Sequence, residues 1–106
     1  MSGIVVVTTV HIKDGHHAAV VERLKGLAAQ THADVGCLAY AIHKDVDDPH
    51  VLVVVERWTS QVALENHLLQ PYVRDIIDAA QELLERPPAP RVLEPVSAGD
   101  AGKGML

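Results

Sequence analysis

The chain has 106 residues, which is enough for one domain with a single hydrophobic core. Apolar residues make up 48% and charged residues 22%, which is typical of a globular protein and argues against global disorder. The formal net charge is −5, and no cluster of Lys and Arg occurs, so we expect no nucleic-acid partner.

Nothing in the sequence predicts a membrane protein. No apolar run reaches 18 residues, and the start MSGIVVVTTV lacks the basic segment of a signal peptide. The single cysteine, Cys37, cannot form an internal disulfide. We therefore expect a cytoplasmic protein with no membrane partner.

The first half of the chain alternates between strand and helix patterns. Residues 4–10 (IVVVTTV) are β-branched and predict a strand, and KDG at 13–15 predicts a turn. Helical spacing of apolar residues predicts a helix over 16–31. Residues 36–44 and 51–58 predict two strands, which the short loop DVDDP joins as an antiparallel hairpin.

The second half predicts helix and then a last strand. Thr59 or Ser60 is a good N-cap for the helix that follows, and Pro71 breaks or restarts that helix. An apolar stripe continues it through Val73, Ile76, Ile77, Ala80, Leu83 and Leu84. RPPAP cannot be helical, 91–96 predict a short strand, and we expect the glycine-rich tail 97–106 to be mobile.

The element order β-α-β-β-α-β predicts an α+β, ferredoxin-like domain over 1–96, with a four-stranded antiparallel sheet and two helices on one face. Strands 4–10 and 51–58 are apolar on both of their faces. The face without helices would be a large apolar patch in a monomer. We therefore expect a homodimer through that sheet face.

Alternation along the strands predicts an apolar cavity between sheet and helices. One face of strand 51–58 carries Leu52, Val54, Glu56 and Trp58. One face of strand 36–44 carries Leu38, Tyr40 and Ile42. His67 lies on the inward stripe of the next helix, so we expect Tyr40, Glu56, Trp58 and His67 to supply the few polar groups of this cavity.

The segment from Gly36 to Pro71 resembles the antibiotic biosynthesis monooxygenase family, whose members are dimeric α+β barrels. The family pattern is Gly-Cys, a nearby Tyr, a hairpin rich in Asp and Pro, Glu-x-Trp, and a helix that carries His. This chain meets it with Gly36, Cys37, Tyr40, Asp47, Asp48, Pro49, Glu56, Trp58, Ala63 and His67. The family includes quinol and polyketide oxygenases, haem degraders and an isomerase branch, so the resemblance does not name one reaction.

The resemblance implies a cofactor-independent monooxygenase that oxidises a small phenol, quinol or polyketide-type aromatic with O2 as co-substrate. His67 would be the general base, because an imidazole titrates near neutral pH. Trp58 would form a wall of the cavity and act in catalysis with His67. The substrate would contact Thr8, Tyr40, Val54, Glu56 and Tyr72.

Structural roles are the alternatives at these positions. His67 and Trp58 could simply be packed core residues, and Glu56 could serve the dimer contact. Two other functions also stay open: a non-catalytic module that binds a small ligand, and an O2-independent isomerase that works by acid–base chemistry.

Two branches of the family fit the sequence less well. The Asn, Trp and axial His of the haem degraders fall at Thr8, His67 and Ile77, so all three are missing. The polyketide oxygenases keep a Trp at the position of Trp58, but their Asn four residues earlier is Val54 here. The seven histidines show no metal-ligand spacing, so we expect no metal site.

Overall fold

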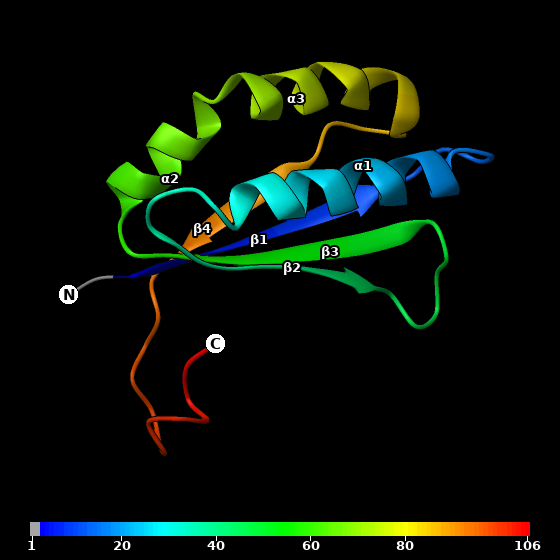
Figure 1. Ribbon diagram of the computed structural model, residues 1–106. Coiled ribbons are helices and arrows are strands. Elements are labelled where there is room, and N and C mark those ends of the chain that lie inside the picture. The colour runs from blue at the N-terminus through cyan, green and yellow to red at the C-terminus, as the bar shows by residue number, and fades with distance from the viewer. Residues whose placement is uncertain (1–2) are drawn as a thin grey trace.

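The computed structural model describes residues 3–106, which form one sheet with helices on one side (Figure 1). The elements are β1 (Ile4–His11), α1 (His17–Thr31), β2 (Cys37–Lys44), β3 (Val51–Trp58), α2 (Gln61–Leu68), α3 (Pro71–Leu83) and β4 (Ala89–Leu93). The strand order is β2-β3-β1-β4, and every neighbouring pair is antiparallel. The predicted ferredoxin-like fold is confirmed.

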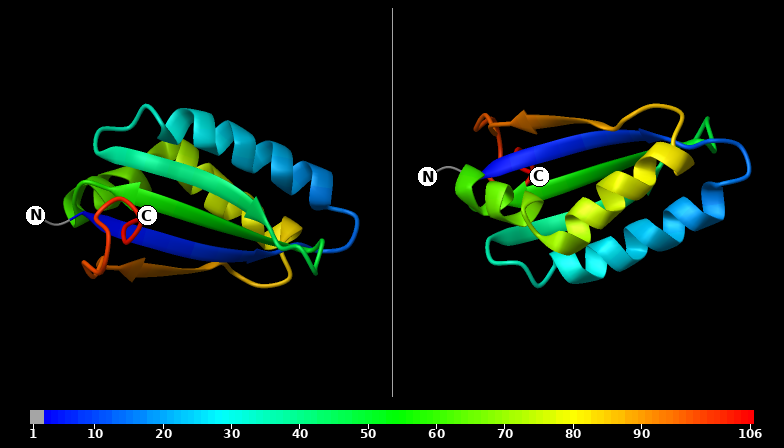
Figure 2. Two further views of the ribbon diagram at one scale, coloured as in Figure 1. Left: turned by 90° about the horizontal axis from the view of Figure 1, so that it is seen from below. Right: turned by 90° about the horizontal axis from the view of Figure 1, so that it is seen from above.

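Local sequence signals explain how the second helical segment divides. Ser60 caps α2, since its hydroxyl accepts a hydrogen bond from the Ala63 N–H at 3.1 Å. Pro71 stands at the first position of α3, where its missing N–H leaves no helical bond unmade. Pro71 therefore starts a second helix, and α2 can lie at a different angle from α3 (Figure 2).

The last strand begins two residues before the predicted one and ends three residues earlier. β4 covers Ala89–Leu93 and pairs with β1, with Val5 opposite Leu93 and Thr8 opposite Pro90. A proline is tolerated there because β4 is an edge strand and needs hydrogen bonds on one side only. Pro95 follows soon after Leu93, beyond the end of the pairing.

The prediction that Leu38 shares a face with Tyr40 and Ile42 is wrong. The β2–β3 register shifts between Cys37 and Ala39, which places Leu38 in a β-bulge, and its side chain is 53% exposed. Cys37 packs inward instead, opposite Trp58. Tyr40 and Ile42 keep the predicted orientation, opposite Glu56 and Val54.

In the part of the chain that the structure describes, helices cover one face of the sheet and only the C-terminal tail lies on the other (Figures 1 and 2). Alternate residues of β3 are buried under the helices, whereas Val51, Val53 and Val55 on the opposite face are half-buried. Among residues 3–106, no helix is long and apolar enough to cross a membrane.

Candidate active site

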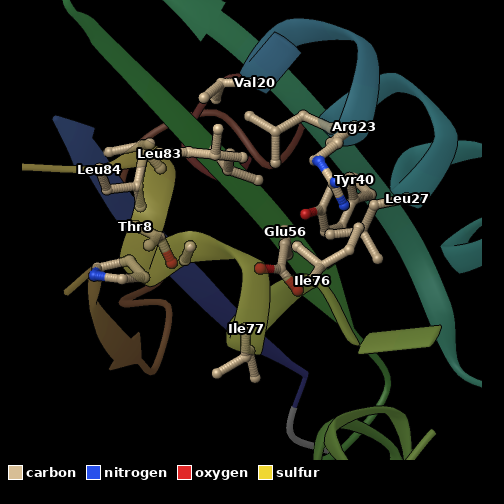
Figure 3. A pocket seen from close by; sticks show the side chains of 15 residues that line it. Thr8, Val20, Arg23, Leu27, Tyr40, Glu56, Ile76, Ile77, Leu83 and Leu84 are labelled. Atoms are coloured by element: carbon tan, nitrogen blue, oxygen red, sulfur yellow. The ribbon is translucent and has the colours of Figure 1, made fainter. Parts of the chain in front are cut away.

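A cavity of about 140 Å³ lies between the helical layer and the sheet (Figure 3). Its polar lining consists of Thr8, Arg23, Tyr40 and Glu56. Its apolar walls are Val10, Val20, Leu24, Leu27, Val54, Ile76, Ile77, Ala80, Leu83, Leu84 and Pro88. A dry apolar cavity of about 150 Å³ accommodates benzene, so this one has room for roughly one six-membered ring.

Strand register places the polar groups of the floor side by side. Tyr40 of β2 pairs with Glu56 of β3, and Thr8 of β1 pairs with Val54, two residues before Glu56. Directly paired residues of antiparallel strands point to the same face. Figure 3 shows the Glu56 carboxylate and the Tyr40 hydroxyl pointing into the cavity.

Glu56 is the acidic group of the cavity, and only 8% of the residue is exposed. Its Oε1 accepts a hydrogen bond from the Trp58 indole N–H at 3.0 Å. Burial raises the pKa of Glu56, while the Trp58 hydrogen bond and the nearby His67 partly offset that rise. A carboxylate with a raised pKa is a stronger base than an ordinary one, which suits proton transfer.

Tyr40 lies opposite Glu56 on the neighbouring strand, and its hydroxyl is a potential hydrogen-bond donor. Burial raises the pKa of the Tyr40 hydroxyl, and the neighbouring Glu56 raises it further. The hydroxyl therefore stays protonated at neutral pH. It can donate a hydrogen bond to an oxygen of a bound molecule while Glu56 accepts one.

Trp58, His67 and Tyr72 are not among the residues that line this cavity, and their predicted roles in binding and catalysis stay predictions. Trp58 is fully buried and packs in a second core cluster with Ile4, Val6 and Leu64 beneath α2. The His67 ring lies behind it, with the two ring centres 4.7 Å apart. The sequence placed these side chains on the correct face, but periodicity does not show how far along the sheet the cavity extends.

His67 is buried and belongs to a polar cluster with the half-buried Asp34 and Tyr72. His67 Nδ1 donates to Asp34 Oδ2 at 2.7 Å, and the Tyr72 hydroxyl donates to the same oxygen. Burial and the Asp34 hydrogen bond raise the pKa of Tyr72 to about 12. His67 also borders a separate polar cleft together with Asp34 and Asn66. The cluster joins the loop before β2 to α2 and α3.

Gly36 lets the Asp34 loop approach α2 closely. Its φ is +88°, a conformation that favours glycine, and a Cβ built there would lie 2.5 Å from Ala63 Cβ. The Thr59 N–H donates to the Gly36 carbonyl at 2.9 Å, which fixes the loop against the end of β3. Gly36 thereby helps to hold Asp34 within reach of His67.

Comparison with known proteins decides the family. The sequence profile of the family described as antibiotic biosynthesis monooxygenase matches residues 3–79. The chain belongs to the antibiotic biosynthesis monooxygenase family. The resemblance read from the sequence is confirmed, while the dimer that it implies stays a prediction.

Two relatives are similar to this chain over most of its length. Rv0793 from Mycobacterium tuberculosis is 33% identical over 78 residues, which are 74% of this chain and 76% of the relative. Its solved structure has a TM-score of 0.86 and covers 93% of this chain and 100% of that one, at 28% identity. PA3566 from Pseudomonas aeruginosa has a TM-score of 0.85 and 26% identity, and covers 92% and 97%.

Two residues near the site, Arg23 and Asp34, were not identified from the sequence. Arg23 flanks the buried stripe of Val20, Leu24 and Leu27, so helical spacing could have placed it at the edge of the cavity. Asp34 lies in a loop, where no periodicity reports the direction of a side chain. Among residues 3–106, no group of three His, Cys, Asp or Glu side chains could hold a metal ion.

Burial of Glu56 predicts a pH dependence of stability. Its folded pKa lies above the unfolded value, so the folded chain keeps a proton that the unfolded chain has lost. This contribution is fully present below the unfolded pKa of about 4.3 and is lost as pH rises through the folded pKa. We expect Glu56→Gln to lose less stability than wild type between about pH 4 and pH 7. Urea unfolding at about pH 4 and pH 7 measures this change in the free energy of unfolding.

Glu65→Gln is the control, because Glu65 is exposed, and its stability should change with pH as that of wild type does. Equal losses of stability in wild type and Glu56→Gln would contradict the prediction.

Proposed function

We propose that this protein is a cofactor-independent monooxygenase for small phenols or hydroquinones. The observation that carries the proposal is a buried carboxylate, Glu56, opposite a protonated tyrosine in a mostly apolar cavity of one-ring size. Membership of the antibiotic biosynthesis monooxygenase family supports the reaction class. The cavity supports the size and polarity of the substrate.

Glu56, rather than His67, is the proposed base. The apolar side chains of α1, α3 and β3 would hold the ring, with one substrate hydroxyl against Glu56. Glu56 would take the proton of that hydroxyl, and Tyr40 would donate a hydrogen bond to the resulting oxyanion. Burial raises the pKa of Glu56 toward that of a phenol, which is ordinarily about 10. A smaller difference between the two pKa values makes proton transfer from the phenol less unfavourable.

The electrons for O2 reduction would come from the substrate itself. The hydroquinone anion would transfer one electron to O2, and the semiquinone and superoxide would then combine into a ring peroxide anion, which takes the proton held by Glu56 and becomes the hydroperoxide. The ring carbon would then lose its hydrogen as a proton while the O–O bond breaks, and that proton would join the leaving hydroxide to form water. One hydroquinone and one O2 thus give one hydroxyquinone and one water, with no flavin or metal required.

Trp58 and His67 lie outside the cavity lining and would position the Glu56 carboxylate. The Trp58 N–H fixes one carboxylate oxygen, which leaves the other free for the substrate. The His67 ring packs against Trp58 at a tilt of 37°, and Asp34 and Tyr72 hold the His67 ring in turn. His67 is therefore proposed as a positioning residue.

The homodimer belongs to the proposal, because half-buried valines line the sheet face that no helix covers. We expect the wild type to have twice the 11.4 kDa mass of one chain by light scattering. Val55→Glu should give monomers, since it puts an unpaired charge into the contact. The control Val46→Glu adds the same charge at a residue that is 96% exposed, and should stay dimeric. A monomeric wild type would contradict the expectation.

Oxygen uptake by flavin-free, chelator-treated protein tests the function. The panel consists of one-ring hydroquinones and three-ring anthrones, each with and without enzyme. We expect uptake with the one-ring compounds, because the cavity holds roughly one ring. Loss of substrate without O2 would favour an O2-independent isomerase, and binding without turnover would favour a non-catalytic ligand-binding protein.

The cytoplasmic location of the protein stays a prediction.

A further inference from the structure

Arg23 is the cation of the cavity lining, and the mechanism above does not use it. It lies on α1, one turn after Val20 and one turn before Leu27, both of which are buried. Arg23 itself is exposed, whereas Glu56 is buried. Its guanidinium therefore lies where the cavity meets solvent, and Figure 3 shows the Arg23 side chain among those that line the cavity.

This guanidinium has no ion-pair partner among residues 3–106. The ion pair within α1 joins Lys25 to Glu22 and leaves Arg23 out. The other described ion pairs involve histidines, and Glu56 takes part in none of them. Arg23 therefore contributes no internal ion pair to the fold, and its donors are free to bind a ligand.

The surroundings of Arg23 favour an anionic group over a neutral one. A guanidinium donates two parallel hydrogen bonds to a carboxylate, and the adjoining apolar wall weakens competition from water. The chain is acidic overall, and an ionised Glu56 would repel an acidic group deep in the cavity. The acidic group of a ligand is therefore most favourably placed at the opening, where Arg23 supplies a positive charge.

We propose that Arg23 forms an anion subsite at the cavity mouth, and that the substrate is a single-ring phenol or hydroquinone bearing a carboxylate or similar acidic substituent. This inference rests on the proposed function, since Glu56 is taken to receive the phenolic end. The two charged side chains then orient the ring, with its hydroxyl toward Glu56 and its acidic group toward Arg23.

Ligand binding tests the subsite without any turnover. The probes are 4-hydroxybenzoate, its neutral methyl ester and phenol, titrated calorimetrically at pH 7. We expect wild type to bind the acid about 2- to 5-fold more tightly than the ester, the upper range for an exposed ion pair. Arg23→Gln should lose that preference and bind the two neutral probes as wild type does.

Two variants control for charge and shape. Arg74→Gln removes the same charge from α3 outside the cavity lining and should keep the preference for the acid. Arg23→Lys should keep part of it, since an ammonium offers charge without the planar fork. The preference should also fall as salt rises, because the site is open to solvent.

The outcomes separate this inference from the proposed function. Equal binding of acid and ester by wild type would overturn the anion subsite and leave the aromatic cavity intact. An unchanged preference in Arg23→Gln would overturn the role of Arg23. Failure of wild type to bind any of the three probes would overturn both the subsite and the aromatic-binding cavity on which the proposed function depends.

Discussion

Replacing Glu56 by Gln is expected to lower kcat for hydroquinone oxidation by about 10²–10⁴-fold, the usual contribution of a general base. Glutamine keeps the size of the side chain and an oxygen that can accept the Trp58 hydrogen bond, but it cannot take the substrate proton. Steady-state oxygen uptake at saturating substrate gives the comparison. Binding of phenol should change little, which would separate the loss of chemistry from a loss of fold.

The pH profile gives this prediction a second measurement. Glu56 must be ionised to act as a base, so activity should rise with pH through its folded pKa. Burial raises that pKa, so the rise should lie above the ordinary carboxylate range. Glu56→Gln should abolish this limb of the profile.

His67→Ala is the matched comparison for the assignment of the base. His67 contacts Trp58, which donates to Glu56, so the loss of His67 should cost less activity than the loss of Glu56 and should move the pH profile. His67 lowers the pKa of Glu56, so the limb should shift to higher pH without it. Full activity in Glu56→Gln together with inactive, folded His67→Ala would return the role of base to His67.

Replacing Gly36 by Ala is expected to destabilise the fold strongly. A left-handed conformation costs a non-glycine residue about 1–2 kcal/mol. The added Cβ would also lie 2.5 Å from Ala63 Cβ and 2.8 Å from Thr59 Oγ1, and Ala63 sits in a capped helix that cannot yield easily. We expect a total loss of about 3 kcal/mol or more in the free energy of unfolding.

Gly15→Ala is the control for this clash. Gly15 has a similar φ of +82°, but a Cβ there meets nothing within 4 Å. Its cost should therefore be the conformational part alone, about 1–2 kcal/mol. Urea unfolding measures both variants. Equal losses at the two glycines would show that α2 does not pack tightly on the Asp34 loop.

Strand alternation predicted much of the site because β3 obeys it along its whole length. Val54, Glu56 and Trp58 all point toward the helices, as expected from the period of two. Pairing with β2 then brings Tyr40 beside Glu56. These residues needed no tertiary information beyond the antiparallel hairpin.

Depth along the sheet could not be predicted in the same way. Trp58 lies two residues beyond Glu56 on the same face, yet it is packed under α2 while Glu56 borders the cavity. The break at Pro71 decides this, since it lets α2 and α3 cover different parts of the sheet. Periodicity gives the face of a residue, whereas helix placement decides what covers it.

The contacts of loop residues and the position of the bulge could not be predicted from the sequence for a related reason. Asp34 lies outside any regular element, and its contacts with His67 and Tyr72 join residues 33 and 38 positions apart. The bulge at Leu38 reverses one side chain without a glycine or proline to mark it. Neither feature leaves a local pattern in the sequence.

Oxidation of a one-ring hydroquinone under ¹⁸O2 by metal-free, flavin-free protein tests the central claim most directly. We expect one ¹⁸O atom in each hydroxyquinone product, the other in water, and one O2 consumed for each substrate. Glu56→Gln should form less labelled product in the same time, in proportion to its lower rate, with one ¹⁸O atom still in each product molecule. Unlabelled quinone with an equal amount of hydrogen peroxide would contradict the claim, because the protein would then be removing electrons without inserting oxygen.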